Sequence, residues 1–462
     1  MKLRNLFLAS AAIAGLFTAC SNEMDEAVDN GAQAKEEAYV SFAIQMPSSA
    51  ATRAVPEEGS LEESKVSEVT LLFFDSSAPH NLTDIQTISA PTKSTTGYTY
   101  NTDAFLISKG EKLVYAFANA QPTIKAFVTN DNGAAYKTIT EDVATDLAST
   151  LAVDNKFTMS NAEAAIPTNI AFTTPEAAKK APITIKIERT VAKVMYTGDD
   201  QNPSNTFPIK RLGDGTKLGD VTLTDMTLIN ANKKYYYLRR TSTNATGTPY
   251  TIGGVETDGT TYVVDPNFTK NVGEITTSYI TENFTDFTTT TIAKNKSLYC
   301  LENTMSQNGQ YYGATTGVTF KAKFAFDGNT GTFYRFNGQL YKSTELAALK
   351  TAAGITEADN VTNNWTPAQW KAKNVDFYKD GICYYHYMIK HVDNNDPATM
   401  GIMEYGVVRN NVYKLNVTSI KEIGANIPEI DPETPDETEK VYIAVSVTVK
   451  PWTERSNENI GL

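Results

Sequence analysis

Cysteine and histidine are scarce: the chain has 462 residues but only 3 cysteines and 3 histidines. Apart from Cys20, the cysteines are Cys300 and Cys383, and two thiols in a chain of this length do not make a disulfide scaffold. They either pair with each other or remain as small buried apolar side chains. His386 and His391 lie in a stretch with strand character and lack further ligands at the spacing of a zinc site. We therefore expect no metal site.

Basic clusters and enzyme motifs are also missing from the sequence. The net charge is −12 and no basic stripe occurs, which argues against a nucleic-acid partner. No G-x-S-x-G, P-loop or dinucleotide-binding fingerprint stands out. The run from Asp393 to Asp396 lacks the glycine and glutamate of an EF-hand, so it is predicted to be a turn or at most a surface calcium site. The sequence thus predicts neither an enzyme nor a cofactor.

The prominent apolar run is Leu6 to Phe17, which is too short for a transmembrane helix. Basic residues precede it and small residues follow, the layout of a secretory signal peptide over residues 1–20. Its end, Leu16-Phe17-Thr18-Ala19-Cys20, resembles the lipobox of bacterial lipoproteins. That resemblance implies that Cys20 is acylated and becomes the first residue of a membrane-tethered protein. The alternative is an ordinary signal peptide with a chance cysteine.

Residues 21–37 are acidic and small and lack any apolar period, so they are expected to be a flexible tether. An acidic stretch directly after the lipidated cysteine also resembles the surface-export signal of Bacteroidota lipoproteins. This resemblance implies the outer face of the outer membrane.

The composition favours strands, since threonine, asparagine, tyrosine and phenylalanine are plentiful while charged residues are only 20%. Many short strands separated by Gly, Asn and Asp argue for sandwiches rather than a parallel α/β sheet. The expected strands are 39–46, 66–75, 97–102, 112–118, 183–188, 191–196, 221–228, 235–239, 262–265, 298–301, 318–326, 332–336, 384–390, 410–420 and 441–449. Short helices are predicted over 343–353 and 367–373, the second capped by Thr366.

The first and last strands have the clearest alternation. In Tyr39–Met46, apolar residues at even positions alternate with the rest, and residues 48–64 after it are predicted to be an exposed loop that contains Arg53. Residues 422–440 form a Pro-rich acidic linker that is not expected to build a core. The strand after it alternates almost perfectly, with Val441, Ile443, Val445, Val447 and Val449 on one face. A strand this apolar must be buried against something.

Several segments resemble the fimbrillin family of Bacteroidales type V pili. The segments that carry the resemblance are Gly110–Asn119 (G-x-x-x-V-Y-x-x-A-N), Phe157–Ser160 (F-x-M-S), Ile187–Val194 (R-x-V-A-K-V), Tyr299–Thr304 (x-E-N-T), Met403–Tyr413 and Pro451-Trp452. The last two are most similar to the C-terminal domain of stalk subunits, particularly those of short, Mfa-type fimbriae. Each motif alone is short, but they occur in this order over nearly the whole chain.

The resemblance implies an all-β fold with two Greek-key or transthyretin-like β-sandwich domains and short helical insertions in the second. It implies the following organisation: signal peptide 1–20, propeptide 21–53, N-terminal sandwich 54–180, C-terminal sandwich 181–440 and donor-strand segment 441–462. An arginine- or lysine-specific protease would cut between Arg53 and Ala54 and remove the anchor with the first strand. The C-terminal strand of an identical subunit would then fill the vacated groove and build a filament that also contains anchor and tip subunits.

A second hypothesis belongs to a different class: a surface glycan-binding protein that stays anchored by its lipid, or an anchor or tip protein of the pilus. Tyr235-Tyr236-Tyr237 and Tyr384-Tyr385 would form the binding platform, although aromatic strand pairs are more often sheet packing. The two hypotheses differ in where the mature chain starts.

Overall fold

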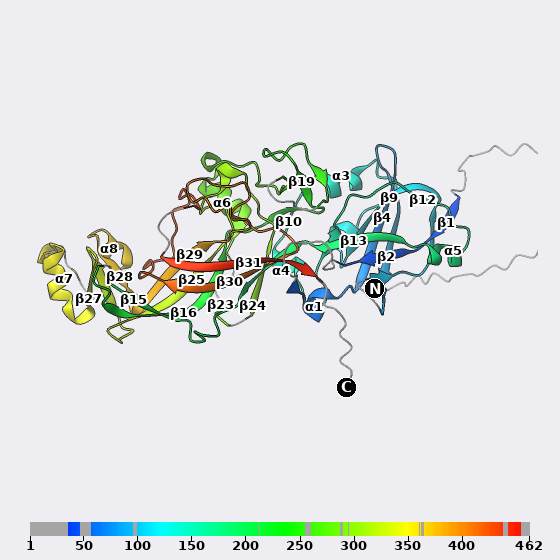
Figure 1. Ribbon diagram of the computed structural model, residues 1–462. Helices are drawn as coiled ribbons and strands as arrows, with labels where there is room; N and C mark the ends of the chain where they lie inside the picture. The colour runs from blue at the N-terminus through cyan, green and yellow to red at the C-terminus, as the bar shows by residue number, and fades with distance from the viewer. Residues whose placement is uncertain are drawn as a thin grey trace, which may run out of the picture. The chain divides into compact units, whose positions relative to one another are not determined.

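Alternating apolar and polar residues become the strands of three main sheets in the computed structural model of the chain (Figure 1). The structure describes residues 36–46, 57–95, 99–211, 213–254, 260–286, 290–293, 295–359, 361, 365–437 and 442–453. From Glu37 onward the chain forms one compact unit. The expected all-β character is confirmed, because strands predominate and the helices are short.

The first sheet contains the beginning of the described chain. Its strands, in spatial order, are β5 (Leu82–Ser89), β4 (Glu68–Asp75), β9 (Gly110–Ala118), β11 (Met159–Asn161), β13 (Ile183–Arg189), β2 (Phe42–Gln45), β7 (Thr99–Asn101) and β6 (Thr92–Lys93), with β12 (Thr168–Ile170) also on β9. The strand β2 runs parallel to β13, with Phe42 opposite Ile183, and antiparallel to β7. Just before it, β1 (Glu37–Val40) pairs with β8 (Phe105–Ser108). The strand β2 is therefore an internal strand of the sheet.

Two further sheets face each other. The second sheet has the order β24 (Lys296–Leu301), β14 (Val191–Tyr196), β30 (Asn411–Ile420), β31 (Ile443–Thr453) and β3 (Glu57–Glu58). The third sheet has the order β15 (Thr206–Lys210), β16 (Lys217–Ile229), β25 (Gly317–Phe326) and β29 (Ile382–Met388), with β23 (Thr290–Thr291) on β16. Apolar residues from both sheets enclose one buried cluster, which we call the second core. The chain passes from the first sheet to the second at Thr190, whereas the expected domain boundary near residue 180 stays a prediction.

Small sheets and short helices complete the described chain. The small sheets are β27 (Gln339–Lys342) with β26 (Phe333–Phe336) and β28 (Asp376–Tyr378), β20 (Thr251–Ile252) with β19 (Arg240–Ser242) and β21 (Tyr262–Val263), β10 (Val143–Thr145) with β18 (Lys234–Tyr236), and β17 (Ala231–Asn232) with β22 (Phe284–Thr285). The α-helices are α1 (Leu61–Ser64), α2 (Pro122–Lys125), α3 (Ala134–Thr140), α4 (Ala148–Leu151), α5 (Pro175–Lys180), α6 (Thr277–Asn283), α7 (Leu346–Ala352) and α8 (Pro367–Lys371). Short 3₁₀ turns lie at Val272–Glu274, Gln307–Gly309, Ser343–Glu345, Glu357–Asp359 and Lys379–Gly381. None of the helices in the described part has the length and apolarity needed to cross a membrane.

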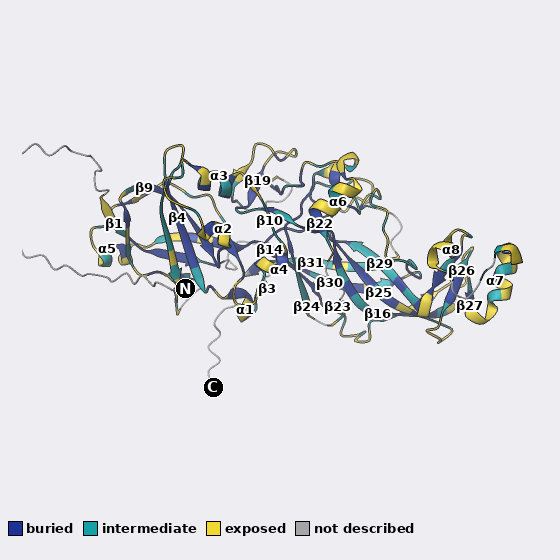
Figure 2. Cartoon of the chain, turned by 180° about the vertical axis from the view of Figure 1, so that it is seen from behind, coloured by how far each residue is buried: buried dark blue, intermediate teal, exposed yellow. Residues whose placement is uncertain are grey.

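Most expected strands and both expected helices are confirmed. The strand β4 is buried on both faces, as its nearly continuous apolar run predicts, and Thr366 caps α8 by accepting a hydrogen bond from the Gln369 backbone N–H. In Figure 2 the strands of the sheets are largely dark blue, whereas α7 and α8 carry much yellow. The strand β5 was not expected, because its partly exposed position leaves it rich in Thr, Asp and Gln.

Three expectations from the sequence are wrong. The stretch Tyr39–Met46 is not one strand: it changes partners at Ser41, whose hydroxyl donates to the carbonyl of Ala178, so β1 and β2 pair in different sheets. The end of the expected loop 48–64 is the capped helix α1. The start of the linker 422–440 packs against the protein, because Ala425 pairs with Tyr384. For Tyr39–Met46 and the linker the tertiary contacts decide the pairing, whereas α1 has a local capping box at its start.

Candidate functional site: the first strand and the C-terminal strand

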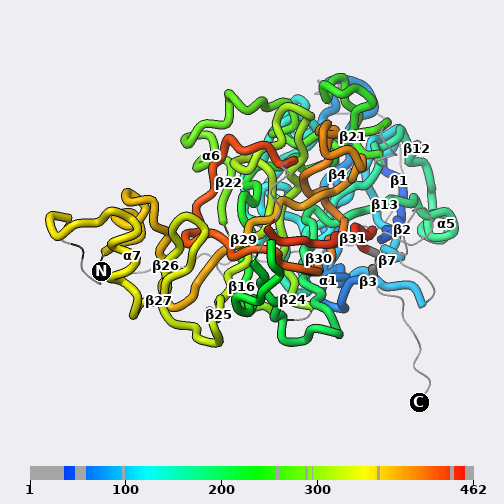
Figure 3. The backbone as a smooth tube through the Cα atoms, turned by 60° about the vertical axis from the view of Figure 1, so that its left-hand side comes forward, coloured from blue at the N-terminus to red at the C-terminus, as the bar shows by residue number. Residues whose placement is uncertain are grey.

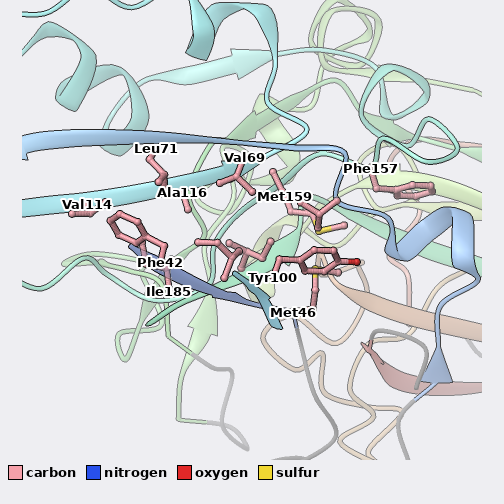
Figure 4. Close-up of a cluster of buried hydrophobic side chains, with 14 of the residues drawn as sticks. Phe42, Met46, Val69, Leu71, Tyr100, Val114, Ala116, Phe157, Met159 and Ile185 are labelled. Atoms are coloured by element: carbon pink, nitrogen blue, oxygen red, sulfur yellow. The ribbon is translucent and has the colours of Figure 1, made fainter. Parts of the chain in front are cut away.

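We call β1 and β2 together the first strand. Its apolar side chains are buried against those of the first sheet. The buried cluster there, which we call the first core, includes fully buried Phe42, Ile44, Leu71, Phe73, Phe157 and Met159. The ring of Phe42 contacts the ring of Phe73 edge-on at 5.8 Å between centroids and stacks on Phe105 at 6.1 Å. Figure 4 shows Phe42 beside Ile185 and Met46 beside Tyr100, both within this cluster. The expected apolar face of the strand is confirmed.

Removing the first strand would open a long apolar slot. Ala38, Val40, Phe42, Ile44 and Met46 are at most 3% exposed, and β13 and β7 would each lose a backbone partner. The four larger side chains each contribute about 1.5–3 kcal/mol by burial, which is roughly 6–12 kcal/mol in total before ordering costs. An exposed slot with unpaired backbone on its sides is a template for an added strand.

The C-terminal strand β31 completes its own sheet in this chain. It pairs antiparallel with β30, with Val445 opposite Val417 and Val449 opposite Tyr413 (Figure 3). Ile443 is only 2% exposed, whereas Val445, Val447 and Val449 are partly exposed. The strand is thus part of its own subunit's sheet in the single chain. Its middle is therefore paired through backbone but incompletely buried.

The partly exposed valines line a groove of about 1210 Å³ between β31 and β29. Tyr384 and Tyr387 form part of its opposite wall, and Lys390, Asp436 and Glu437 lie at a polar end. The Lys390 ammonium lies 3.0 Å from Glu437 and 3.0 Å from Glu404. Burial raises the pKa of Asp436 well above its ordinary value, and the Thr315 hydroxyl donates to its carboxyl at 2.7 Å.

The motifs that the sequence singles out lie together in space. The side-chain amide of Asn119 donates to the carbonyl of Phe157 at 2.9 Å, and the Phe157 ring contacts Trp452 edge-on at 5.7 Å between centroids. The Arg189 guanidinium lies 4.3 Å from the centre of the Trp452 ring. Asn410 accepts from the backbone N–H of Arg189 at 3.4 Å. Five of the six motif segments thus meet where the first and second sheets adjoin.

Residues of the motif segments take part in two buried ion pairs. Glu188 contacts Arg239 at 2.6 Å, and Glu302 contacts Arg409 at 3.4 Å. The Arg409 guanidinium also donates to the carbonyl of Tyr236 at 2.8 Å. Burial raises the pKa of Glu188 to about 7 although Arg239 favours its charged form. Arg409 and Glu302 are at most 1% exposed, so each depends on its partner for compensation of its charge.

Replacing Arg409 by methionine should destabilise the subunit by about 3–5 kcal/mol, because the change leaves Glu302 buried without its counter-charge. Denaturant unfolding of the unassembled protein measures this loss. Arg211→Met is the matched control, since Arg211 pairs with Asp214 at an exposed position and its loss should not change the free energy of unfolding measurably. Equal free energies of unfolding for the two variants would contradict the conclusion that Arg409 compensates the buried charge of Glu302.

Several residues predicted from the sequence lie outside the described residues. These are Cys20, Arg53, Ala54 and Val441. Their expected roles in lipidation, cleavage and strand donation stay predictions.

The two cysteines outside the signal sequence are buried free thiols, which settles the alternative that the sequence leaves open. Burial raises the pKa of Cys300 to about 12 and that of Cys383 to about 11, so both stay protonated. Tyr235 and Tyr385 are each 2% exposed and serve packing rather than a platform. Tyr384, in contrast, lines the groove. His386 is partly buried, and burial lowers its pKa to about 4.

The helix α1 is a part of the site that the sequence analysis missed. Ser60 caps it, and Glu63 accepts from the Ser60 backbone N–H at 2.6 Å, which forms a capping box. The pattern Ser-x-x-Glu at 60–63 was a recognisable signal for this start. It was hidden because the surrounding residues are small and acidic.

The family model for the C-terminal domain of fimbrillin, described as major fimbrial subunit protein type IV, matches residues 376–458. This range contains β29, β30 and β31 and the groove between β29 and β31. The whole chain is similar to the minor fimbrium subunit Mfa1 of Porphyromonas gingivalis, with 24% identity and 98% of both chains covered. This relative is named as a fimbrial subunit.

Solved structures with a similar path of the chain include a putative cell adhesion protein from Parabacteroides distasonis, with 13% identity, a TM-score of 0.48 and coverage of 90% of this chain and 98% of that one. Another is the tip fimbrial protein Mfa3 of Porphyromonas gingivalis, with 11% identity, a TM-score of 0.41 and coverage of 90% and 100%. The chain is thus similar to the fimbrillins: the fimbrillin C-terminal model matches its residues 376–458, and a minor fimbrium subunit is similar over its full length.

Proposed function

We propose that the chain is a structural subunit of an extracellular surface fimbrium that supports adhesion, and that it polymerises by protease-triggered donor-strand exchange. The observation that carries the proposal is that an internal first strand with a buried apolar face shortly precedes Arg53 in the sequence. A cut between Arg53 and Ala54 would disconnect this strand from the rest of the chain. Its departure would create an acceptor slot without unfolding the other sheets.

The C-terminal strand is the proposed donor. Its apolar face carries Ile443, Val445, Val447 and Val449, and Val441 continues the same alternation in the sequence. Five such side chains contribute roughly 7–15 kcal/mol on full burial, and each backbone hydrogen bond adds about 0.5–1.5 kcal/mol. The three valines from 445 to 449 are partly exposed in the chain's own sheet. Exchange into a closed slot therefore increases their burial, which favours the assembled state.

The proposed contact is head-to-tail, because donor and acceptor are different parts of the subunit. Such a contact does not close on itself and therefore builds a linear filament. The partners are identical subunits along the shaft, anchor and tip subunits at its ends, and an arginine- or lysine-specific processing protease. Before cleavage the lipid on Cys20 holds the precursor at the outer membrane.

The test is the N-terminal sequence of the protein recovered from surface filaments. A mature chain that starts at Ala54 is the expected result, because only the cut after Arg53 opens the slot. A blocked N-terminus on an acylated Cys20 in the shaft material would contradict the proposal. Absence of the protein from the shaft would reject the stalk assignment and leave an anchor or tip role.

The groove beside β31 favours a second candidate, a lipid-anchored glycan-binding protein. Tyr384 and Tyr387 line this groove next to carboxyl groups, which is compatible with stacking on sugar rings. This candidate predicts that Cys20 remains attached and that the protein is monomeric in detergent. N-terminal sequencing of the surface form separates the two candidates.

A further inference from the structure

The end of the C-terminal strand is held much more firmly than its middle. Trp452 is fully buried, stacks on Tyr299 with 5.9 Å between ring centroids, and faces the Arg189 guanidinium at 4.3 Å. Its backbone N–H donates to Asn410 and its carbonyl accepts from Arg189, both at 3.0 Å. The cation–aromatic contact and the two backbone bonds fix this residue from several sides.

The segment that holds Trp452 comes directly after the proposed cleavage site. The strand β3 pairs in parallel with Trp452 and Thr453. Gly59 packs so closely on the Trp452 ring that a Cβ at this position would lie 2.8 Å from Nε1. The segment Glu57–Ser64, which we call the latch, thus covers the end of β31.

Charged side chains tie the latch to the residues around Trp452. Arg189 donates to the carbonyl of Glu63 at 3.1 Å and to the hydroxyl of Ser64 at 3.2 Å. The Glu63 carboxylate lies 2.7 Å from the Lys193 ammonium and accepts from the Tyr299 hydroxyl at 2.6 Å. Burial opposes ionisation of Glu63, but Lys193 and the hydrogen bonds outweigh it and lower the pKa of this carboxyl. Arg189 and Tyr299 therefore contact the latch and Trp452 at once.

We propose that the latch keeps the C-terminal strand in its own sheet until the chain is cut after Arg53. In the intact chain both ends of the latch are connected to strands of the first sheet. The strand β2 precedes the latch in the sequence, and β4 follows it. After the cut, the latch is the new N-terminal segment, and two paired residues at a chain end fray readily. Cleavage then opens the acceptor slot and loosens the donor strand of the same subunit. This inference rests on the proposed function, because it gives that mechanism its regulation.

Hydrogen exchange on the full chain tests the latch directly. Residues 49–54 are replaced by the recognition site of a site-specific protease, and the monomer is compared before and after cutting, with size-exclusion chromatography to verify that it has not assembled. The backbone N–H groups of 443–453 should exchange at least 10-fold faster after the cut, whereas those of β16 and β25 should not change. Equal exchange of 443–453 before and after cutting would overturn the latch.

Two matched variants provide an independent measurement. Glu63→Gln keeps the shape of the capping box but weakens its bond to Lys193, so it should speed exchange of 443–453 several-fold in the uncut protein. Glu274→Gln is the control, because Glu274 occupies the same position in another capping box but is exposed, where it pairs with Lys270. Similar exchange in both variants would reject the role of Glu63.

The failure of the latch and the failure of strand donation are distinguishable. If cutting leaves exchange unchanged but substitutions in β31 still prevent filaments, only the latch is wrong. If filaments form regardless of β31, donation is wrong, whatever the exchange experiment shows.

Discussion

Replacing Arg53 by alanine is expected to leave the precursor exported and folded but to abolish filament formation. The reason is that the uncut first strand keeps the slot filled, with Phe42 and Ile44 fully buried and β2 paired on both sides. The burial of this strand amounts to roughly 6–12 kcal/mol, which an external strand would have to displace. Electron microscopy of the cell surface and sedimentation of the purified protein measure the loss.

Two controls accompany this prediction. Arg53→Lys identifies the protease: filaments in this variant indicate an enzyme that accepts lysine, and their loss indicates one specific for arginine. Arg211→Ala changes another arginine, one that lies exposed in the described chain, and should leave assembly unchanged. Normal filaments from Arg53→Ala would place the processing event elsewhere or remove it from the mechanism.

Replacing Val445 by aspartate should also abolish assembly, but from the donor side. In the unassembled subunit Val445 is partly exposed beside the groove, so the monomer should lose only about 1 kcal/mol of stability. In the dry slot of a neighbour an unpaired carboxylate costs several kcal/mol. Filament yield should therefore fall far more than stability does.

Ser446→Asp is the matched control, because Ser446 is the exposed neighbour on the other face of the same strand. Point substitution is a cleaner test than deletion of residues 441–462, since truncation removes Ile443 and Trp452, which are buried in the subunit itself. Heat-resistant filaments from Val445→Asp would show that β31 is not the donor.

The two variants together test the polarity of the contact. Arg53→Ala keeps a donor but no open slot, whereas cleaved Val445→Asp keeps an open slot but no working donor. A mixture should yield short capped pairs rather than filaments, because each protein supplies one half of the contact. Long filaments in the mixture would contradict a head-to-tail arrangement.

The local sequence pattern was sufficient to predict a strand or helix wherever buried residues recur with the period of that element. The strands β4, β9, β13, β14 and β30 and the helices α7 and α8 occur where alternation or helical spacing predicts them. The same patterns could not reveal that β1 and β2 belong to different sheets, because the partner change at Ser41 depends on Ala178, more than a hundred residues away in the chain. The buried position of Asp436 was equally hidden, since its partner Thr315 lies in another part of the chain.

The mostly β character, the resemblance to fimbrillins and the two apolar strands were predictable from the sequence, because they depend on composition, local motifs and a period of two residues. The tertiary structure was needed to show that β31 lies in its own sheet and that the segment after Arg53 covers Trp452. It also showed that Glu302 and Arg409 of two motifs meet, and that Glu188 pairs with Arg239 outside the motifs. These contacts join residues that are distant in the sequence, from 23 positions for Ile420 and Ile443 to 393 positions for Gly59 and Trp452. Their choice depends on how whole sheets pack and compensate buried charge, which no local pattern records.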